Sequence, residues 1–213
     1  MKAMALVALL GVVVPAAWVQ EGTATDAKTI DLFNGADLSG WKLFIPDEKV
    51  APKTVWSVKD GVVRCTGKPA GYMRTEKEYG NYRLRFQWRF PEGGGNSGVL
   101  IHIQLPDKVW PKSIEGQLQH AHAGDFWVID GAEFKEHTDP DNRRVVKKEE
   151  SSEKPLGEWN QYEVLCQGNT IKLFINGVLQ NSATETSLTK GHIGWQSEGT
   201  PIEFRNLVLE TLD

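Results

Sequence analysis

The chain has 213 residues, of which 40% are hydrophobic and 24% are charged, and its formal net charge is −4. This length fits one large β domain, and the hydrophobic fraction is sufficient for a core. A net negative charge disfavours a phosphate-binding surface, so we do not expect nucleic acid as a partner.

The N-terminus carries the three parts of a secretory signal peptide, which we place at residues 1–17. Lys2 supplies a positive charge, residues 3–14 are apolar, and Pro15-Ala16-Ala17 is a small-residue cleavage site. The apolar run is shorter than the roughly 20 residues that span a bilayer, although an anchor or a buried helix is the alternative interpretation. We therefore expect a periplasmic or secreted protein without a stable membrane anchor, in which residues 27–213 form a single domain.

Short alternating runs between turn signals make up the rest of the chain. Asp60-Gly61 and Asn176-Gly177 are strong hairpin signals, because the tight turns of hairpins require positive φ angles. The pattern predicts an all-β sandwich of two antiparallel sheets. The expected strands cover residues 55–59, 62–66, 82–90, 98–105, 113–119, 161–166, 171–175, 178–180, 191–196 and 202–209.

Two of these strands have one apolar and one polar face. The polar positions are Arg83, Arg85, Gln87 and Arg89 in residues 82–90, and His102 and Gln104 in residues 98–105. An ordinary solvated sheet face would carry more Lys, Glu and Thr. If the strands pair within one sheet, we expect these side chains to form the floor of a cleft.

A third strand, residues 113–119, adds a row of hydrogen-bonding side chains. Its alternation places Glu115, Gln117 and Gln119 on one face. A carboxylate and two amides are suited to sugar hydroxyls, and Trp110 and Lys112 precede them at the entrance. The row predicts a carbohydrate site.

Other residues can complete such a site. Asn96 follows three glycines and either lines the mouth of the cleft or belongs to a tight turn. Trp110, Trp127 and Trp195 either stack on sugar rings or pack in the core. We assign to the core Trp41, Trp56, Trp88 and Trp159. Residues 135–154, the most charged segment, are expected to form a solvated loop.

Several segments, taken in order, carry a family resemblance. They are Leu32-Phe33-Asn34-Gly35, Leu38-Ser39-Gly40-Trp41, Trp56-Ser57-Val58, residues 74–82, Gly95-Asn96-Ser97-Gly98-Val99, Gly157-Glu158-Trp159-Asn160, Gly191-His192-Ile193-Gly194, Gln196-Ser197-Glu198-Gly199 and Glu203-Phe204-Arg205-Asn206. In this order the chain resembles the 3-keto-disaccharide hydrolase domain, a bacterial family. The resemblance implies a concanavalin A-like jelly roll, a glycoside or oligosaccharide substrate, and an enzyme that depends on a sugar 3-oxidoreductase to make the ketone.

The chemistry of that family suits a site with a single acid. Conventional glycosidases use two carboxyl groups, and the row of Glu115 offers amides where a second acid would stand. A ketone at C3 instead lets one base remove the C2 proton and expel the C1 substituent. We assign Glu115 as the base and His102 as proton donor or enolate partner, with Arg85 or Arg89 stabilising charge. The alternatives are a structural ion pair between Glu115 and these arginines, and a purely structural histidine.

No cofactor is required by this chemistry, but a divalent metal is a weaker alternative. His120 and His122 share one face of an extended strand, and Asp125 is near in sequence. Calcium at Asp139 and Asp141 is equally untested. A disulfide between Cys65 and Cys166 stays open, because the sequence does not give their separation. The rival to the enzyme is a non-catalytic, lectin-like jelly roll that binds carbohydrate.

Overall fold

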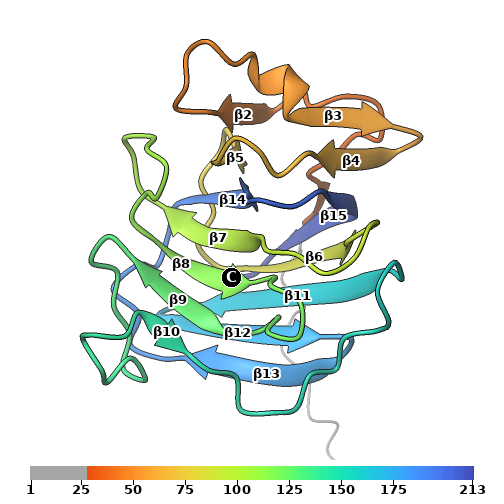
Figure 1. Cartoon of the computed structure of the whole chain (residues 1–213). Coiled ribbons are helices and arrows are strands. Elements are labelled where there is room, and N and C mark those ends of the chain that lie inside the picture. The colour runs from red at the N-terminus through yellow and green to blue at the C-terminus, as the bar shows by residue number, and fades with distance from the viewer. Residues whose placement is uncertain (1–27) are drawn as a thin grey trace, which may run out of the picture.

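A computed structural model describes residues 28–213, so the predicted signal peptide lies outside the described residues. Two antiparallel sheets form a sandwich (Figure 1). The eight-stranded sheet contains β1 (Thr29–Asp31), β3 (Trp56–Lys59), β4 (Val62–Cys65), β6 (Tyr82–Arg89), β11 (Asn160–Gln167), β12 (Thr170–Ile175), β13 (Val178–Ala183) and β15 (Ile202–Thr211). The seven-stranded sheet contains β2 (Trp41–Phe44), β5 (Gly71–Thr75), β7 (Gly98–Ile103), β8 (Ser113–Gln117), β9 (Phe126–Ile129), β10 (Arg144–Val145) and β14 (His192–Ser197).

The order of the strands shows how distant segments meet. The larger sheet runs β13-β12-β11-β6-β15-β4-β3, with β1 paired to β15, and the smaller runs β10-β9-β8-β7-β14-β5-β2. A 3-10 helix, η1 (Pro52–Thr54), precedes β3. Within residues 28–213, no helix is long and apolar enough to span a membrane. The all-β jelly roll is thus confirmed.

The strand boundaries follow the predicted runs closely. The two hairpin turns form as expected, with positive φ at Asp60 and Gly61 and at Asn176 and Gly177. The prediction missed β1, β2, β5, β9 and β10, which are short or carry little alternation. Residues 135–154 were expected to be a solvated loop, but they include β10, which pairs with β9.

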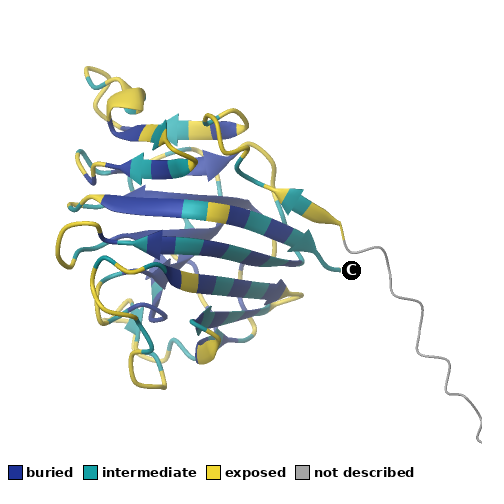
Figure 2. Cartoon of the chain, turned by 90° about the vertical axis from the view of Figure 1, so that its right-hand side faces the viewer, coloured by how far each residue is buried: buried dark blue, intermediate teal, exposed yellow. Residues whose placement is uncertain are grey.

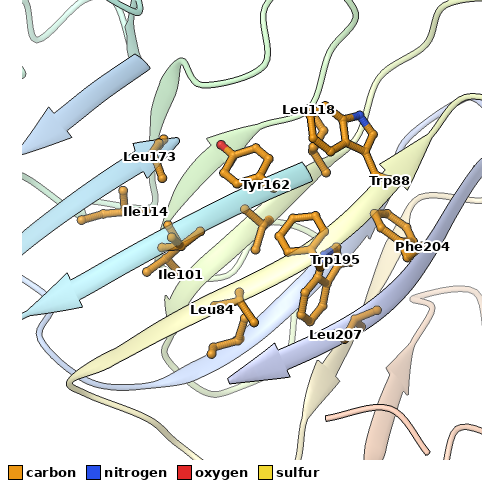
Figure 3. Packing of buried hydrophobic residues seen from close by; sticks show 14 of the residues in the cluster. Leu84, Trp88, Ile101, Ile114, Leu118, Tyr162, Leu173, Trp195, Phe204 and Leu207 are labelled. Atoms are coloured by element: carbon orange, nitrogen blue, oxygen red, sulfur yellow. The ribbon is translucent and has the colours of Figure 1, made fainter. Parts of the chain in front are cut away.

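The core lies between the sheets, where alternate residues of both face inward (Figure 2). Figure 3 shows Trp88 and Tyr162 of the larger sheet packed over Trp195 and Ile101 of the smaller. Trp41, Trp56 and Trp88 are buried, as predicted. Trp159 is not in the core, because it lies half-buried on the outside with the guanidinium groups of Arg89 and Arg205 4.6 and 4.1 Å from its ring centroid.

Candidate active site

A pocket of about 370 Å³ opens on the outer face of the seven-stranded sheet. Its position follows from alternation: Ile114 on β8 and Trp195 on β14 point into the core, so Glu115 and Gln196 point outward. The side chains that line the pocket are Asn96, Trp110, Glu115, Gln117, Gln119, Trp127, Ile129, Arg143, Gln196 and Glu198.

The predicted row on β8 lies in this pocket. Glu115, Gln117 and Gln119 all contribute to its wall, although β8 itself ends at Gln117. The Gln117 Oε1 atom accepts hydrogen bonds of 2.9 Å from the backbone N–H groups of Leu118 and Gln119. Gln117 therefore also shapes the end of the strand, and its amide is held in place before any ligand binds.

Glu115 is almost completely buried, at 5% exposure. Gly98, in the neighbouring β7, leaves the space that its carboxylate fills: a Cβ atom there would lie 2.3 Å from Glu115 Oε1 and 2.4 Å from Gln196 Oε1. The Gln196 Nε2 atom donates a 3.2 Å hydrogen bond to Glu115 Oε2. The absence of a side chain at Gly98 is thus a requirement of the site.

The surroundings of Glu115 favour its protonated form. Its pKa is raised from 4.5 to about 8, chiefly by burial and in addition by the negative charge of Glu198, while the Gln196 hydrogen bond and Arg143 act in the opposite direction. A carboxyl group that exchanges its proton near neutral pH, in a pocket, is typical of acid–base catalysis.

Glu198 is a second carboxylic acid in the pocket, and it corrects the expectation of a single acid. It follows directly after β14 and is partly buried, which raises its pKa, whereas Arg143 lowers it. The prediction considered only acids along one strand, whereas the fold brings the second from a strand two positions away in the sheet. The alternation of Gln196 and Glu198 with the inward-facing Trp195 was the signal that could have revealed them.

Arg143 comes from the charged segment 135–154. Its guanidinium lies 5.5 Å from the centre of the Trp127 ring, at cation–π distance. The next residue, Arg144, fixes this segment by donating a 2.7 Å hydrogen bond from Nε to the buried Asp125. Among residues 28–213, the segment therefore supplies the one cation that lines the pocket, and nothing in its sequence distinguished Arg143 from its charged neighbours.

Three buried polar atoms of the pocket residues have no hydrogen-bond partner within the part of the chain that the structure describes. They are Asn96 Oδ1, Trp127 Nε1 and Gln196 Oε1. Buried polar atoms normally have partners, so the presence of three unpartnered atoms around one pocket is unusual. Two acceptors and one donor beside two tryptophans match the hydroxyl groups and apolar faces of a sugar.

The two predicted arginines do not belong to this site. Arg85 and Arg89 lie on β6, in the other sheet, and face outward. Arg85 Nε donates to Glu163 at 2.8 Å, and Arg89 Nη2 lies 2.7 Å from Glu203. The prediction assumed that β6, β7 and β8 belong to one sheet, whereas β6 lies in the larger sheet between β11 and β15. An ion pair between Glu115 and either arginine is excluded for the same reason.

His102 is also outside the site. The pairing of β7 with β14 shifts register here, and His102 has a positive φ of 57°, so the alternation reverses. Its ring packs edge-on against Tyr82 in the core, and Nδ1 lies 3.1 Å from the carbonyl of Leu188. Burial lowers the pKa of the imidazole. The next residue, Ile103, takes the outward face instead.

Of the other side chains predicted to bind the substrate, some line the pocket and some do not. Asn96, Trp110 and Trp127 line the pocket. Trp195 does not, because it is fully buried and contacts Trp41 edge-on at 5.3 Å (Figure 3). Gln104 donates its Nε2 to the carbonyls of His102 and Lys190, and Lys112 lies outside the pocket wall.

The suggested metal ligands have other partners. Both carboxylate oxygens of Asp125 accept hydrogen bonds, from Arg144 Nε and from the backbone N–H of Lys147. Arg144 also lies 2.8 Å from His122 Nδ1, and His120 lies 3.4 Å from Glu153. Within residues 28–213 no three His, Cys, Asp or Glu side chains are placed to hold a metal ion.

The suggested calcium ligands and the cysteines have structural surroundings. The carboxylate of Asp139 accepts the backbone N–H of Asp141 in an exposed turn. Cys65 on β4 and Cys166 on β11 are buried free thiols, separated in the sheet by β6 and β15. Three strand spacings, about 14 Å, are too far for a disulfide.

A jelly roll with an outward pocket of two glutamates, amides and tryptophans is typical of a carbohydrate-active protein. The chain belongs to the 3-keto-alpha-glucoside-1,2-lyase-like domain family, whose family model matches residues 28–210.

Individual relatives are more distant. A protein named 3-keto-disaccharide hydrolase from Bacteroides thetaiotaomicron is 23% identical, over 86% of this chain and 78% of its own length. A structure named as a candidate glycosyl hydrolase from Parabacteroides distasonis is 23% identical with a TM-score of 0.65, covering 87% of this chain and 94% of that one. A β-glucanase from Bacillus licheniformis is 15% identical with a TM-score of 0.56, covering 89% and 100%. These structures share the fold.

Proposed function

We propose that the chain is an exported enzyme that cleaves 3-keto-glycosides by elimination followed by hydration. A ketone at sugar C3 acidifies the C2 hydrogen, so the reaction needs a base at C2, a cation at the C3 oxygen and an acid at the leaving oxygen. Glu115, Arg143 and Glu198 supply these three groups in one pocket. Their convergence is the observation that carries the proposal.

The steps balance without an oxidant or reductant. The Glu115 carboxylate takes the C2 proton, and the electron pair moves to the C3 oxygen, where Arg143 stabilises the negative charge. The enolate then expels the C1 substituent, whose oxygen takes a proton from Glu198, and a C1–C2 double bond forms. Water then adds across this bond: its oxygen joins C1 while the Glu198 carboxylate takes its proton, and Glu115 returns a proton to C2, so both carboxyl groups regain their starting states. The sum is hydrolysis of the glycosidic bond.

Each assignment follows from the surroundings of the group. When ionised, a carboxylate with a pKa of about 8 is a stronger base than an ordinary glutamate, which suits removal of a carbon-bound proton. Glu198, the second carboxylic acid of the pocket, replaces His102 as the proton donor, so the reactive form carries one proton on Glu198 and none on Glu115. Arg143 replaces Arg85 and Arg89 as the cation.

The origin of the substrate follows from the same chemistry. The ketone must be made by an oxidoreductase that acts on C3 of the intact glycoside, so this enzyme would act after it. The charged, apolar and small-residue regions of the first 17 residues support export to the periplasm or beyond. None of these steps requires a metal or other cofactor.

The test compares a 3-keto-disaccharide with its unoxidised parent, with and without a chelator, in D₂O. We expect cleavage of the keto substrate alone, unaffected by chelator, with one deuterium at C2 of the product. Glu115→Gln and Glu198→Gln should each abolish turnover, whereas Glu163→Gln, on the outer face of the other sheet, should retain it. Cleavage of the unoxidised parent at a comparable rate would contradict elimination, because the parent has no acidified C2 hydrogen. Saturable binding with no cleavage would identify a carbohydrate-binding module instead.

A further inference from the structure

The loop of residues 104–112, which we call the Trp110 loop, leaves the sheet after β7 and returns as β8. Its ends are joined by a 2.9 Å hydrogen bond from the backbone N–H of Gln104 to the carbonyl of Lys112. Trp110 lines the pocket and remains 37% exposed. A large aromatic side chain presented in this way at a pocket rim is well placed to contact a ligand.

Asp107 fastens the middle of the Trp110 loop to the sheet. Arg74 of β5 donates to both of its carboxylate oxygens, from Nε at 2.7 Å and from Nη2 at 2.9 Å. Tyr72, also on β5, donates its hydroxyl at 2.7 Å. Arg74 is 7% exposed and Tyr72 is fully buried. A two-pronged, largely buried arginine–carboxylate pair has a defined geometry, so this contact fixes the loop more firmly than a surface pair would.

The pocket changes character along β8, with Glu115 near its middle. Towards the start of the strand lie Trp110 and Ile129, the latter paired with Ser113. Beyond Glu115 lie the hydrogen-bonding side chains, because Gly98 pairs with Gln117 and brings the start of β7 to this end. That second half contains Asn96, Gln117, Gln119 and Gln196, whereas Glu198, the assigned proton donor, lines the pocket from directly after the end of β14. The amide-rich half suits the keto sugar, whose hydroxyls need partners.

We infer that the apolar half, formed by Trp110 and Ile129, binds the leaving group, and that Asp107 acts as a positioning residue by holding Trp110 there through Arg74 and Tyr72. This inference rests on the proposed function. It assigns selectivity for the leaving group to the Trp110 loop, separately from the chemistry at Glu115. The substrate class that follows is a keto-glycoside with a leaving group large enough to stack on an indole ring, such as a second sugar.

The experiment measures KM and kcat for a 3-keto-disaccharide and for methyl 3-keto-glucoside, which has the smallest leaving group. Trp110→Ala should raise KM for the disaccharide about tenfold and leave the methyl glycoside unchanged, since only the former loses an aromatic contact. Asp107→Ala should do the same. If Asp107→Ala folds poorly, Tyr72→Phe replaces it, because this variant removes one hydrogen bond to Asp107 and keeps the ring. Tyr72→Phe should raise KM for the disaccharide alone, by a smaller factor.

The double variant separates positioning from general stability. If Asp107 acts through Trp110, adding Asp107→Ala to Trp110→Ala should not change KM further. Lys108→Gln is the matched control, because it breaks the exposed 2.6 Å pair with Asp130 in the same loop and should leave both substrates unaffected. Equal losses on both substrates, or additive losses in the double variant, would overturn the inference. A wild-type enzyme that cleaves neither keto substrate would instead overturn the proposed function and this inference with it.

Discussion

Replacing Glu115 by glutamine should stabilise the protein while abolishing its activity. In the folded state the pKa of Glu115 rises from 4.5 to about 8, so between these values the folded chain binds a proton that the unfolded chain releases. The contribution of Glu115 to the free energy of unfolding is therefore fully present below pH 4.5 and is lost as pH rises towards 8. Glutamine cannot ionise, so the variant does not incur this loss, and its amide keeps the size of the carboxyl group.

The size of the effect follows from the same two pKa values. At pH 7 Glu115 is ionised in the unfolded chain but mostly protonated in the folded protein, and this difference lowers the free energy of unfolding by about 3 kcal/mol. At pH 5 the same difference lowers it by about 1 kcal/mol. Glu115→Gln should therefore unfold at higher urea concentration than the wild type, with a larger difference at pH 7 than at pH 5. In a thermal scan at pH 7, about 3 kcal/mol corresponds to a rise in Tm of roughly 6–12 °C for a domain of this size.

The assay is equilibrium unfolding in urea at both pH values, with Glu76→Gln as control. Glu76 is exposed, so its replacement should change the unfolding free energy little at either pH. A Glu115→Gln variant that is no more stable than the wild type at pH 7, or whose gain does not grow with pH, would refute the assignment of Glu115 as a buried, high-pKa carboxyl group.

Three further outcomes are expected. Gly98→Ala forces the Glu115 carboxylate from its place, so kcat/KM should fall roughly 100-fold while circular dichroism shows an intact fold. His102→Gln should lower the unfolding free energy by about 1–3 kcal/mol without changing kcat/KM; a selective loss of activity would return His102 to the site. Because Cys65 and Cys166 are separate thiols, Tm should be the same with and without dithiothreitol, and a reductant-dependent shift would contradict the strand order.

Alternation along single strands predicted much of the fold and part of the site. It placed most long strands within two residues and put Glu115 outside the core, because a pleated strand directs successive side chains to opposite faces. It was wrong where the backbone departs from that pattern. At His102 a bulge reverses the alternation, and no residue type in the local sequence marks the bulge.

Strand pairing was the second limit. β6 has the same two-faced pattern as β8, yet it lies in the other sheet, so Arg85 and Arg89 cannot reach the pocket. The partners of a strand depend on contacts distant in the sequence, which its own alternation does not encode. Arg143 and Glu198 were missed for the same reason, since each comes from a segment far along the chain from Glu115.

The way this protein treats its other buried acids supports a functional role for Glu115. Buried Asp125 accepts from Arg144 at 2.7 Å, buried Glu203 lies 2.7 Å from Arg89, and the half-buried Asp107 is paired with Arg74 at 2.7 Å. Within residues 28–213, Glu115 instead has an amide, Gln196, as its hydrogen-bond donor and a second acid nearby. Pairing it with an arginine would remove the cost of about 3 kcal/mol at pH 7, as the fold does elsewhere. A carboxyl group left in this state on an inner strand, with a glycine on the neighbouring strand to make room, is better explained by proton transfer than by stability.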